Sequence, residues 1–192
     1  MASQKIFLVL FILCLVGCVP SLHQLYTEKT LVYDPAIVGN WQQDDELWGF
    51  VGDPNDRSYH LTITEKEDKT SKLLVHLVEV GGRRFFDFYP DKDAELEGGT
   101  WLKFSVIPVH LFLTVDKTEQ VLTLAVMDPD EADKLLAQKP GLVKHERVED
   151  GQVVLTDTPE RLQAFLLEGL KVEGFFGKPF ELTQAKSAEA DP

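Results

Sequence analysis

Residues 58–64 read Ser-Tyr-His-Leu-Thr-Ile-Thr, and apolar side chains occupy every second position of this stretch. Tyr59, Leu61 and Ile63 fall on one side of an extended chain, and the polar residues between them fall on the other. This period of two is typical of a strand with one buried face and one wet face. The stretch therefore predicts a strand that covers a hydrophobic core.

The next two runs predict a hairpin. Residues 73–80 carry apolar side chains in both phases, so we expect this strand to be covered on both faces. Gly81 and Gly82 separate it from residues 83–89, and a glycine pair is a signal for a two-residue turn between antiparallel strands.

Two more hairpins are predicted downstream. Residues 109–115 and 120–127 flank a turn at 117–119, and residues 144–148 and 152–156 flank Asp150-Gly151. Weaker strand candidates lie at residues 36–42, 46–51 and 180–183.

Two helices interrupt the strands. Thr158 can cap the longer one and Pro159 occupies its first position. Its apolar residues fall on one face at helical spacing, namely Leu162, Phe165, Leu166 and Leu170. A shorter helix is predicted over residues 130–138. We expect the longer helix to pack its apolar face on the sheet.

Eight to ten short antiparallel strands joined by tight turns predict a mainly β domain, a sandwich or a closed barrel. We expect one such domain over residues 35–184, preceded by a tether at 18–34 and followed by a frayed polar tail at 185–192. No internal repeat is apparent.

A short motif near the start of this domain favours the barrel. Residues 38–41 read Val-Gly-Asn-Trp, which resembles the Gly-x-Trp opening of the lipocalin superfamily. The resemblance implies an up-and-down barrel in which Gly39 leads into the first strand and Trp41 plugs the closed end. It also implies a cation over Trp41, for which Arg147 is a candidate. The whole chain is similar to a group of uncharacterised bacterial envelope lipoproteins with a lipocalin-like domain, through residues 86–90, 108–110, 155–156 and 162–166.

The first eighteen residues predict export. Lys5 supplies positive charge, residues 6–16 are apolar, and Gly17 precedes Cys18. The apolar run is shorter than the roughly twenty residues needed to span a bilayer. Residues 15–18, Leu-Val-Gly-Cys, resemble the lipobox of bacterial lipoproteins. The resemblance implies that the signal helix at 1–17 is removed and that Cys18 receives palmitate-type acyl chains. An uncleaved anchor is the alternative.

The location and partners follow from that resemblance. Val19, in place of Asp, fits the family's sorting rule for the outer membrane, facing the periplasm. The net charge of −13 becomes one unit more negative when Lys5 is removed. Such a body is repelled by phosphate backbones and anionic head groups, so we expect no nucleic-acid partner and membrane attachment through the lipid alone. Cys14 and Cys18 are the two cysteines, which leaves no disulfide in the mature chain.

Aromatic residues on the predicted strands are candidates for a ligand site. Arg84 shares a phase with two of them and could anchor an acidic ligand. Apolar walls with one or two polar groups are typical of small-molecule sites. The same side chains could fill a solid core, since barrels of about eight strands can be packed by side chains alone. The aromatic candidates are Trp48, Tyr59, Phe86, Phe88 and Phe112.

Patterns for metal binding and catalysis are weak. His60, His76 and His110 lie on three predicted strands and could converge on zinc or haem iron, although single hydrogen bonds would satisfy each one. The acidic stretches at 91–102 and 128–139 lack the glycine and the final glutamate of a calcium loop. No Gly-x-Ser-x-Gly or His-Glu-x-x-His motif occurs. We therefore expect no metal, no cofactor and no enzymatic activity.

The leading hypothesis is a lipid-anchored envelope protein that binds or carries a small hydrophobic molecule without catalysis. A structural or interaction module, whose filled barrel docks on another envelope protein, is the alternative. An enzyme is the third hypothesis, because no paired acid and base can be named.

Overall fold

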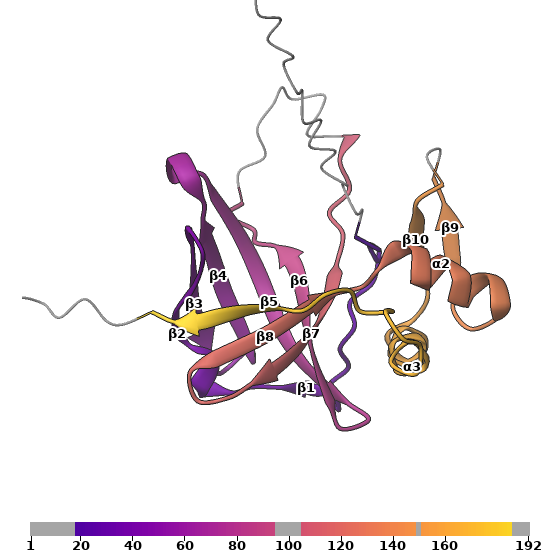
Figure 1. Cartoon of the computed structure of the whole chain (residues 1–192), viewed down its shortest axis with the longest axis horizontal. Coiled ribbons are helices and arrows are strands. Elements are labelled where there is room, and N and C mark those ends of the chain that lie inside the picture. The colour runs from indigo at the N-terminus through magenta and orange to yellow at the C-terminus, as the bar shows by residue number, and fades with distance from the viewer. Residues whose placement is uncertain (1–17, 95–104, 149–150, 186–192) are drawn as a thin grey trace, which may run out of the picture.

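The computed structural model describes residues 18–94, 105–148 and 151–185 (Figure 1). The predicted signal at 1–17 and nearly all of the predicted tail lie outside these residues. Among the helices of the described part, none is long and apolar enough to cross a membrane.

Eight antiparallel strands close into a barrel, which confirms the predicted fold class (Figure 1). Each strand pairs with the next in the order β2-β3-β4-β5-β6-β7-β8-β11, and β11 pairs back with β2. The strands are β2 (Gly39–Gln43), β3 (Glu46–Asp53), β4 (Ser58–Thr64), β5 (Thr70–Val80), β6 (Arg83–Pro90), β7 (Leu111–Lys117), β8 (Val121–Val126) and β11 (Phe180–Gln184).

The glycine pair predicted to turn the central hairpin does so. Gly81 and Gly82 have φ angles of 60° and 73°, which other residues adopt only with strain, and Val80 pairs with Arg83 across the turn. The weaker strand candidates also form strands, except that the first begins with a 3-10 turn, η1 (Pro35–Ile37). A second turn of this type, η2 (Lys66–Asp68), joins β4 to β5.

The helices α2 (Pro129–Gln138) and α3 (Pro159–Gly169) lie together on one side of the barrel (Figure 1). Asp128 caps α2 by accepting hydrogen bonds from the amides of Asp130 and Glu131. The third predicted hairpin forms as β9 (His145–Arg147) and β10 (Val153–Leu155), but this pair is a separate two-stranded sheet beside the helices.

The alternation of side chains along the strands produces two cores. The inner core fills the barrel, and the outer core lies between the barrel wall and the helices. On β5, Val75 and Leu77 enter the inner core while Val78 enters the outer core. This division confirms that residues 73–80 are covered on both faces.

One end of the barrel is closed as the lipocalin resemblance implies. Trp41 is fully buried, and its indole Nε1 donates a hydrogen bond of 2.8 Å to the carbonyl of Ile37 in η1. The ammonium group over the Trp41 ring belongs to Lys117, at 5.9 Å from the ring centroid. Arg147 lies on β9 and pairs with Asp133, so its predicted position over Trp41 is wrong.

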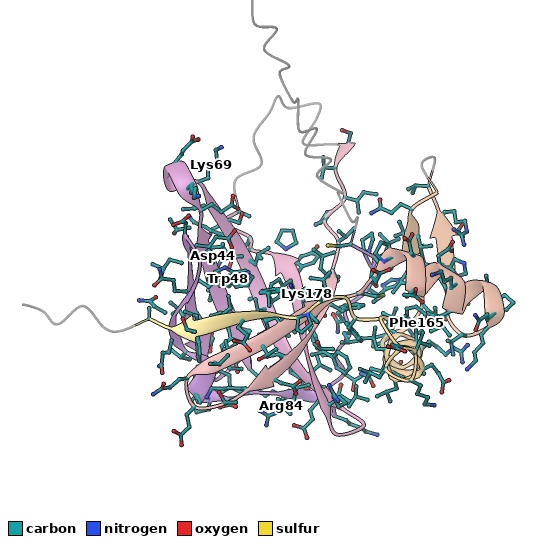
Figure 2. The ribbon with its side chains drawn as sticks, viewed as in Figure 1. Asp44, Trp48, Lys69, Arg84, Phe165 and Lys178 are labelled. Carbon is teal, nitrogen blue, oxygen red and sulfur yellow. The ribbon has the colours of Figure 1, made fainter. Side chains whose placement is uncertain are left out.

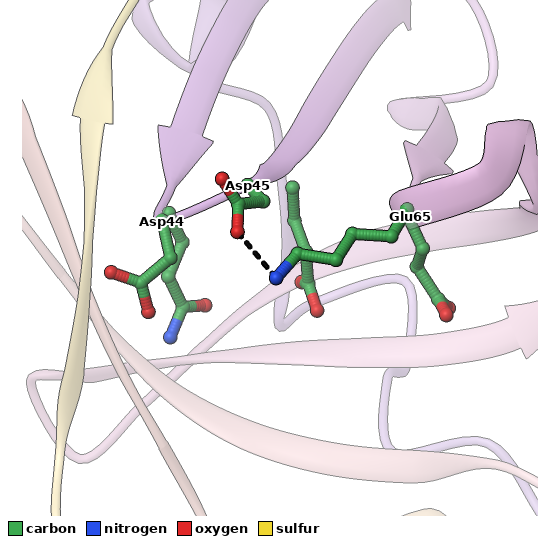
Figure 3. Close-up of a pocket in the computed structure, with 6 residues that line it drawn as sticks. Asp44, Asp45 and Glu65 are labelled. Carbon is green, nitrogen blue, oxygen red and sulfur yellow. Dashed lines mark ion pairs between the residues drawn. The ribbon is translucent and has the colours of Figure 1, made fainter.

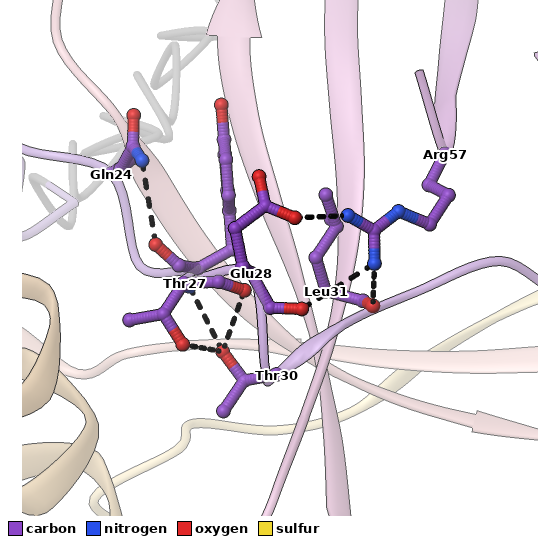
Figure 4. A network of polar contacts seen from close by, with 7 residues as sticks. Gln24, Thr27, Glu28, Thr30, Leu31 and Arg57 are labelled. Atoms are coloured by element: carbon purple, nitrogen blue, oxygen red, sulfur yellow. Dashed lines mark hydrogen bonds and ion pairs between the residues drawn. The ribbon is translucent and has the colours of Figure 1, made fainter. Parts of the chain in front are cut away.

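Residues 18–34 pack along the outside of the barrel instead of extending from it as a tether. Val19 and Leu25 belong to the outer core, and Leu31 begins a two-residue strand, β1 (Leu31–Val32), that pairs with β5. Burial of these apolar side chains is the physical reason for the packing. The guanidinium of Arg57 holds the segment by binding Glu28 and the carbonyl of Leu31 (Figure 4).

Candidate functional site

Four of the five aromatic candidates meet inside the barrel. Trp48, Tyr59, Phe86 and Phe88 all belong to the inner core and are at most 7% exposed. The rings of Phe86 and Phe88 lie 5.8 Å apart, and those of Trp48 and Phe88 lie 6.2 Å apart. The structure therefore brings these residues together as one aromatic cluster.

The fifth candidate, Phe112, is placed differently. It belongs to the outer core and pairs in register with Asp87, so its ring points away from the barrel interior. Apolar residues occupy successive positions of β7, on both faces of the strand. The alternation of apolar and polar residues therefore could not identify which face points into the barrel. Phe112 is therefore not part of an interior site.

Arg84 shares the inward phase of Phe86, as predicted, but it lies at the closed end. Its guanidinium donates hydrogen bonds to Glu79 at 3.0 Å and to Asp34 at 3.1 Å. Figure 2 shows Arg84 at the opposite end of the barrel from Asp44 and Trp48. Two carboxylates therefore already pair with the guanidinium of Arg84, which was expected to anchor an acidic ligand.

The floor of the barrel is solid. The Tyr59 hydroxyl accepts a hydrogen bond from the Asp34 amide at 2.7 Å and donates one to the Asp34 carbonyl at 3.1 Å. Burial raises the pKa of Tyr59 to about 12, so the phenol stays protonated. Phe50 stacks on Phe86 at 5.9 Å and meets Tyr59 edge to face at 6.3 Å. These three rings pack together within the inner core.

The other end, which we call the barrel mouth, is apolar and less covered. Trp48 and Phe88 lie at the bottom of the mouth, and the Trp48 ring contacts Phe180 at 6.2 Å. The Nε1 of Trp48 donates a hydrogen bond of 3.1 Å to Glu46. Half-buried apolar side chains from five strands surround them, namely Ile63, Leu73, Leu111, Val126 and Phe180.

A polar pocket of about 290 Å³ lies beside the mouth, between the β2–β3 turn and η2 (Figure 3). Asp44, Asp45 and Glu65 line it, and the ammonium of Lys66 pairs with Asp45 at 2.7 Å. This ion pair raises the pKa of Lys66. Both partners are well exposed, so the pair contributes little to stability.

A buried carboxylate on the outer face was not predicted. Asp87 is fully buried and accepts hydrogen bonds from the Leu25 amide at 2.8 Å and from His110 Nδ1 at 2.7 Å. Burial raises its pKa, and the contact with His110 opposes that effect. The signal in the sequence was one acidic residue in the middle of an aromatic strand, at residues 83–90. Asp87 therefore fixes the N-terminal segment to the barrel wall.

The three histidines that were considered as possible metal ligands do not converge. His60 contacts Asp91, His110 contacts Asp87, and His76 packs against the Tyr26 ring at 4.2 Å. In the parts of the chain that the structure describes, no group of three or more histidine, cysteine or acidic side chains could hold a metal ion.

Two larger pockets open on the outside of the barrel. One of about 590 Å³ lies over β4 and β5, and one of about 680 Å³ lies between β9 and the start of α3. Neither of these two pockets, nor the polar pocket beside the mouth, is lined by residues of the inner core.

Cys18 is half-buried at the first described position, and burial raises the pKa of its thiol. Its carbonyl accepts a hydrogen bond of 3.1 Å from the Gln152 side chain. The residue predicted to carry the lipid therefore lies directly against the folded body.

No protein-family model, no curated protein and no solved structure matches this chain.

Proposed function

We propose that this chain is an exported, lipid-anchored envelope protein whose barrel binds one small hydrophobic molecule at its mouth without catalysing a reaction. The observation that carries the proposal is the composition of the mouth. Five half-buried apolar side chains surround two aromatic rings at one end of a barrel that is sealed at the other.

The aromatic rings in the middle of the barrel limit how deeply a ligand can enter from the mouth. Phe50, Tyr59 and Phe86 occupy the middle of the barrel in ring-to-ring contact, so an acyl chain or flat ring would rest on them instead of passing between them. Burial of an apolar ligand against such a surface contributes about 25 cal/mol for each Å² removed from water. The part of the ligand that enters the mouth should be apolar, because Arg84, the expected anchor for an acidic group, is paired at the far end.

The proposed anchor is supported by the sequence around Cys18. The apolar run before it has the length and composition expected of an export signal, and Gly17-Cys18 fits the lipobox. More than one acyl chain on Cys18 would provide stable attachment. Val19 places such a lipoprotein in the outer membrane by the sorting rule of that family.

Binding at the mouth can be tested with a quenching probe on the mature chain carrying Cys18→Ser. We expect dibromostearate to quench the fluorescence of Trp48 saturably, and Trp48→Phe to remove most of that quenching. Phe180→Glu should weaken binding because it puts a charge among the apolar side chains of the mouth. Val51→Glu is the matched control, since Val51 is 66% exposed on the same sheet. Equal binding by these two glutamate variants would refute the mouth as the site.

The anchor is tested separately, by growing cells with an alkyne analogue of palmitate. The wild-type chain should take up the label and Cys18→Ser should not. A labelled Cys18→Ser chain would place the acyl group elsewhere. An unlabelled wild-type chain would refute lipidation without affecting the barrel site.

The filled lower half of the barrel favours a second function, that of an interaction module on another envelope protein. This function predicts no saturable quenching of Trp48 by dibromostearate. It also predicts that a photoreactive residue in place of Val51 or Ile107, which are 66% and 70% exposed, cross-links to one discrete partner in intact cells.

A further inference from the structure

Three exposed apolar side chains lie around the first described residue of the chain. Val106, Ile107 and Val148 are 44%, 70% and 47% exposed. Exposed apolar side chains that occur singly are normal, but a group of them marks a contact with a protein or a membrane. We call these three side chains, together with Cys18, the anchor surface.

One side of the anchor surface is the segment that leads into β7. His110 exchanges two backbone hydrogen bonds with Ser21, of 2.8 and 2.9 Å. Ile107 lies three residues before His110, and Cys18 lies three residues before Ser21, so each Cα is at most about 11 Å from that pair. Figure 1 shows the described chain beginning beside the segment that enters β7.

The other side of the anchor surface is the hairpin of β9 and β10. The side chain of Gln152 donates a hydrogen bond of 3.1 Å to the Cys18 carbonyl. The backbone carbonyl of Gln152 accepts one of 3.0 Å from the Val148 amide, so Val148 is one residue pair away from Cys18. Cys18 therefore lies between two exposed apolar segments that are far apart in the sequence.

We propose that the anchor surface rests on the lipid bilayer and that its three apolar side chains enter the boundary between head groups and acyl chains. This proposal rests on the membrane anchoring proposed above. Both interpretations of the first eighteen residues bring the bilayer to this surface. Acyl chains on Cys18 would start there, and an uncleaved apolar run at 6–16 would end two residues before it.

The size of the anchor surface favours a bilayer over a protein partner. A stable protein interface takes about 20–30 residues from each partner, whereas this surface offers three apolar side chains. Such a contact is weak by itself, but a lipid that already holds the body at the membrane gives it a high effective concentration there. The chain has a net charge of −13, so the contact should be apolar and should favour zwitterionic head groups over anionic ones.

The proposal can be tested by electron paramagnetic resonance on the full lipidated chain in phosphatidylcholine vesicles. A nitroxide label is attached to Ile107→Cys or Val148→Cys, both at exposed positions that do not contribute to either core. We expect oxygen dissolved in the bilayer to reach both labels. We also expect both labels to lose most of their accessibility to a water-soluble nickel complex.

Val51→Cys is the matched control. Val51 is 66% exposed on β3, which pairs with β2 and β4 and not with β7. Its label should stay accessible to the nickel complex. The wild-type chain, treated in the same way, reports any label on its own cysteines.

The outcomes distinguish the anchor surface from the anchor itself. If the chain takes up the palmitate analogue but the labels at 107 and 148 are as accessible to the nickel complex as the label at 51, the anchor surface is wrong and the anchor stands. If the labels are protected from oxygen as well as from the nickel complex, a second copy of the chain covers the surface instead of lipid. A chain that takes up no palmitate analogue and leaves all three labels in water would overturn both proposals.

Discussion

Replacing His76 by Phe should make the protein more stable, and the gain should grow as the pH falls. The imidazole is 8% exposed, and its Nδ1 finds no partner in the described part of the chain. Leaving a buried polar atom unsatisfied costs about 1–3 kcal/mol, and a phenyl ring removes that cost while keeping the contact with Tyr26. At neutral pH we therefore expect His76→Phe to raise the free energy of unfolding by about 1 kcal/mol.

The pH dependence follows from the lowered pKa. Burial, with a smaller effect of His110, lowers the pKa of His76 from 6.5 to about 4, while Asp56 opposes the shift. As the pH falls below 6.5, the unfolded chain takes up the proton first, so wild-type stability is lost between pH 6.5 and about 4. At about 1.4 kcal/mol for each pH unit, the loss reaches about 3 kcal/mol below that window.

Urea unfolding of the wild-type chain, His76→Phe and His76→Gln at several pH values would measure both effects. Neither variant titrates at this position, so both should lose the slope between pH 6.5 and 4, while the stability gain at neutral pH should be specific to Phe. Asp87 has a raised pKa and contributes a slope of opposite sign, but all three proteins share it. If both variants lose stability as steeply as the wild-type chain, the assignment of that slope to His76 is wrong.

Two further substitutions test the packing of the outer core. Asp87→Ala removes the acceptor of His110 and of a backbone amide, and should lower the free energy of unfolding by about 3–5 kcal/mol in urea; Asp87→Asn keeps an acceptor oxygen, and an equal loss in both variants would contradict this explanation. Gly169→Ala adds a methyl group that overlaps the fully buried ring of Phe175 and should lower the melting temperature, with a cost of about 1–3 kcal/mol. Gly141→Ala is the control, since a Cβ there meets nothing within 4 Å, and equal melting temperatures would rule out the steric effect.

The sequence predicted the barrel strands well because local signals and tertiary packing agree there. Residues 58–64 alternate strictly, and β4 spans these same residues with Tyr59 and Leu61 buried. Gly81 and Gly82 tolerate the positive φ angles that the hairpin requires. These features depend on a few neighbouring residues, so one sequence is enough to recognise them.

The candidate site was predicted less well because its residues depend on which face of a strand is inside. Phe112 and Phe88 are equally apolar, yet they lie in different cores because helices cover this barrel from outside. The pairing of Asp87 with Leu25 spans 62 residues of chain, and no local pattern encodes a contact at that separation. The packing of residues 18–34, which were predicted to be a tether, depends on distant contacts of the same kind.

The hydrogen bonds at the start of the described chain determine how the barrel would be held on a membrane. Ser21 exchanges two backbone hydrogen bonds with His110, and the carbonyl of Pro20 accepts one from Leu155. A free segment of sixteen residues could extend roughly 55 Å, but here only Cys18 itself separates the proposed acyl chains from the buried side chain of Val19. A lipid on Cys18 would therefore be connected to the folded body without a flexible segment between them. The proposed anchor would hold the barrel close to the bilayer instead of at the end of a long tether.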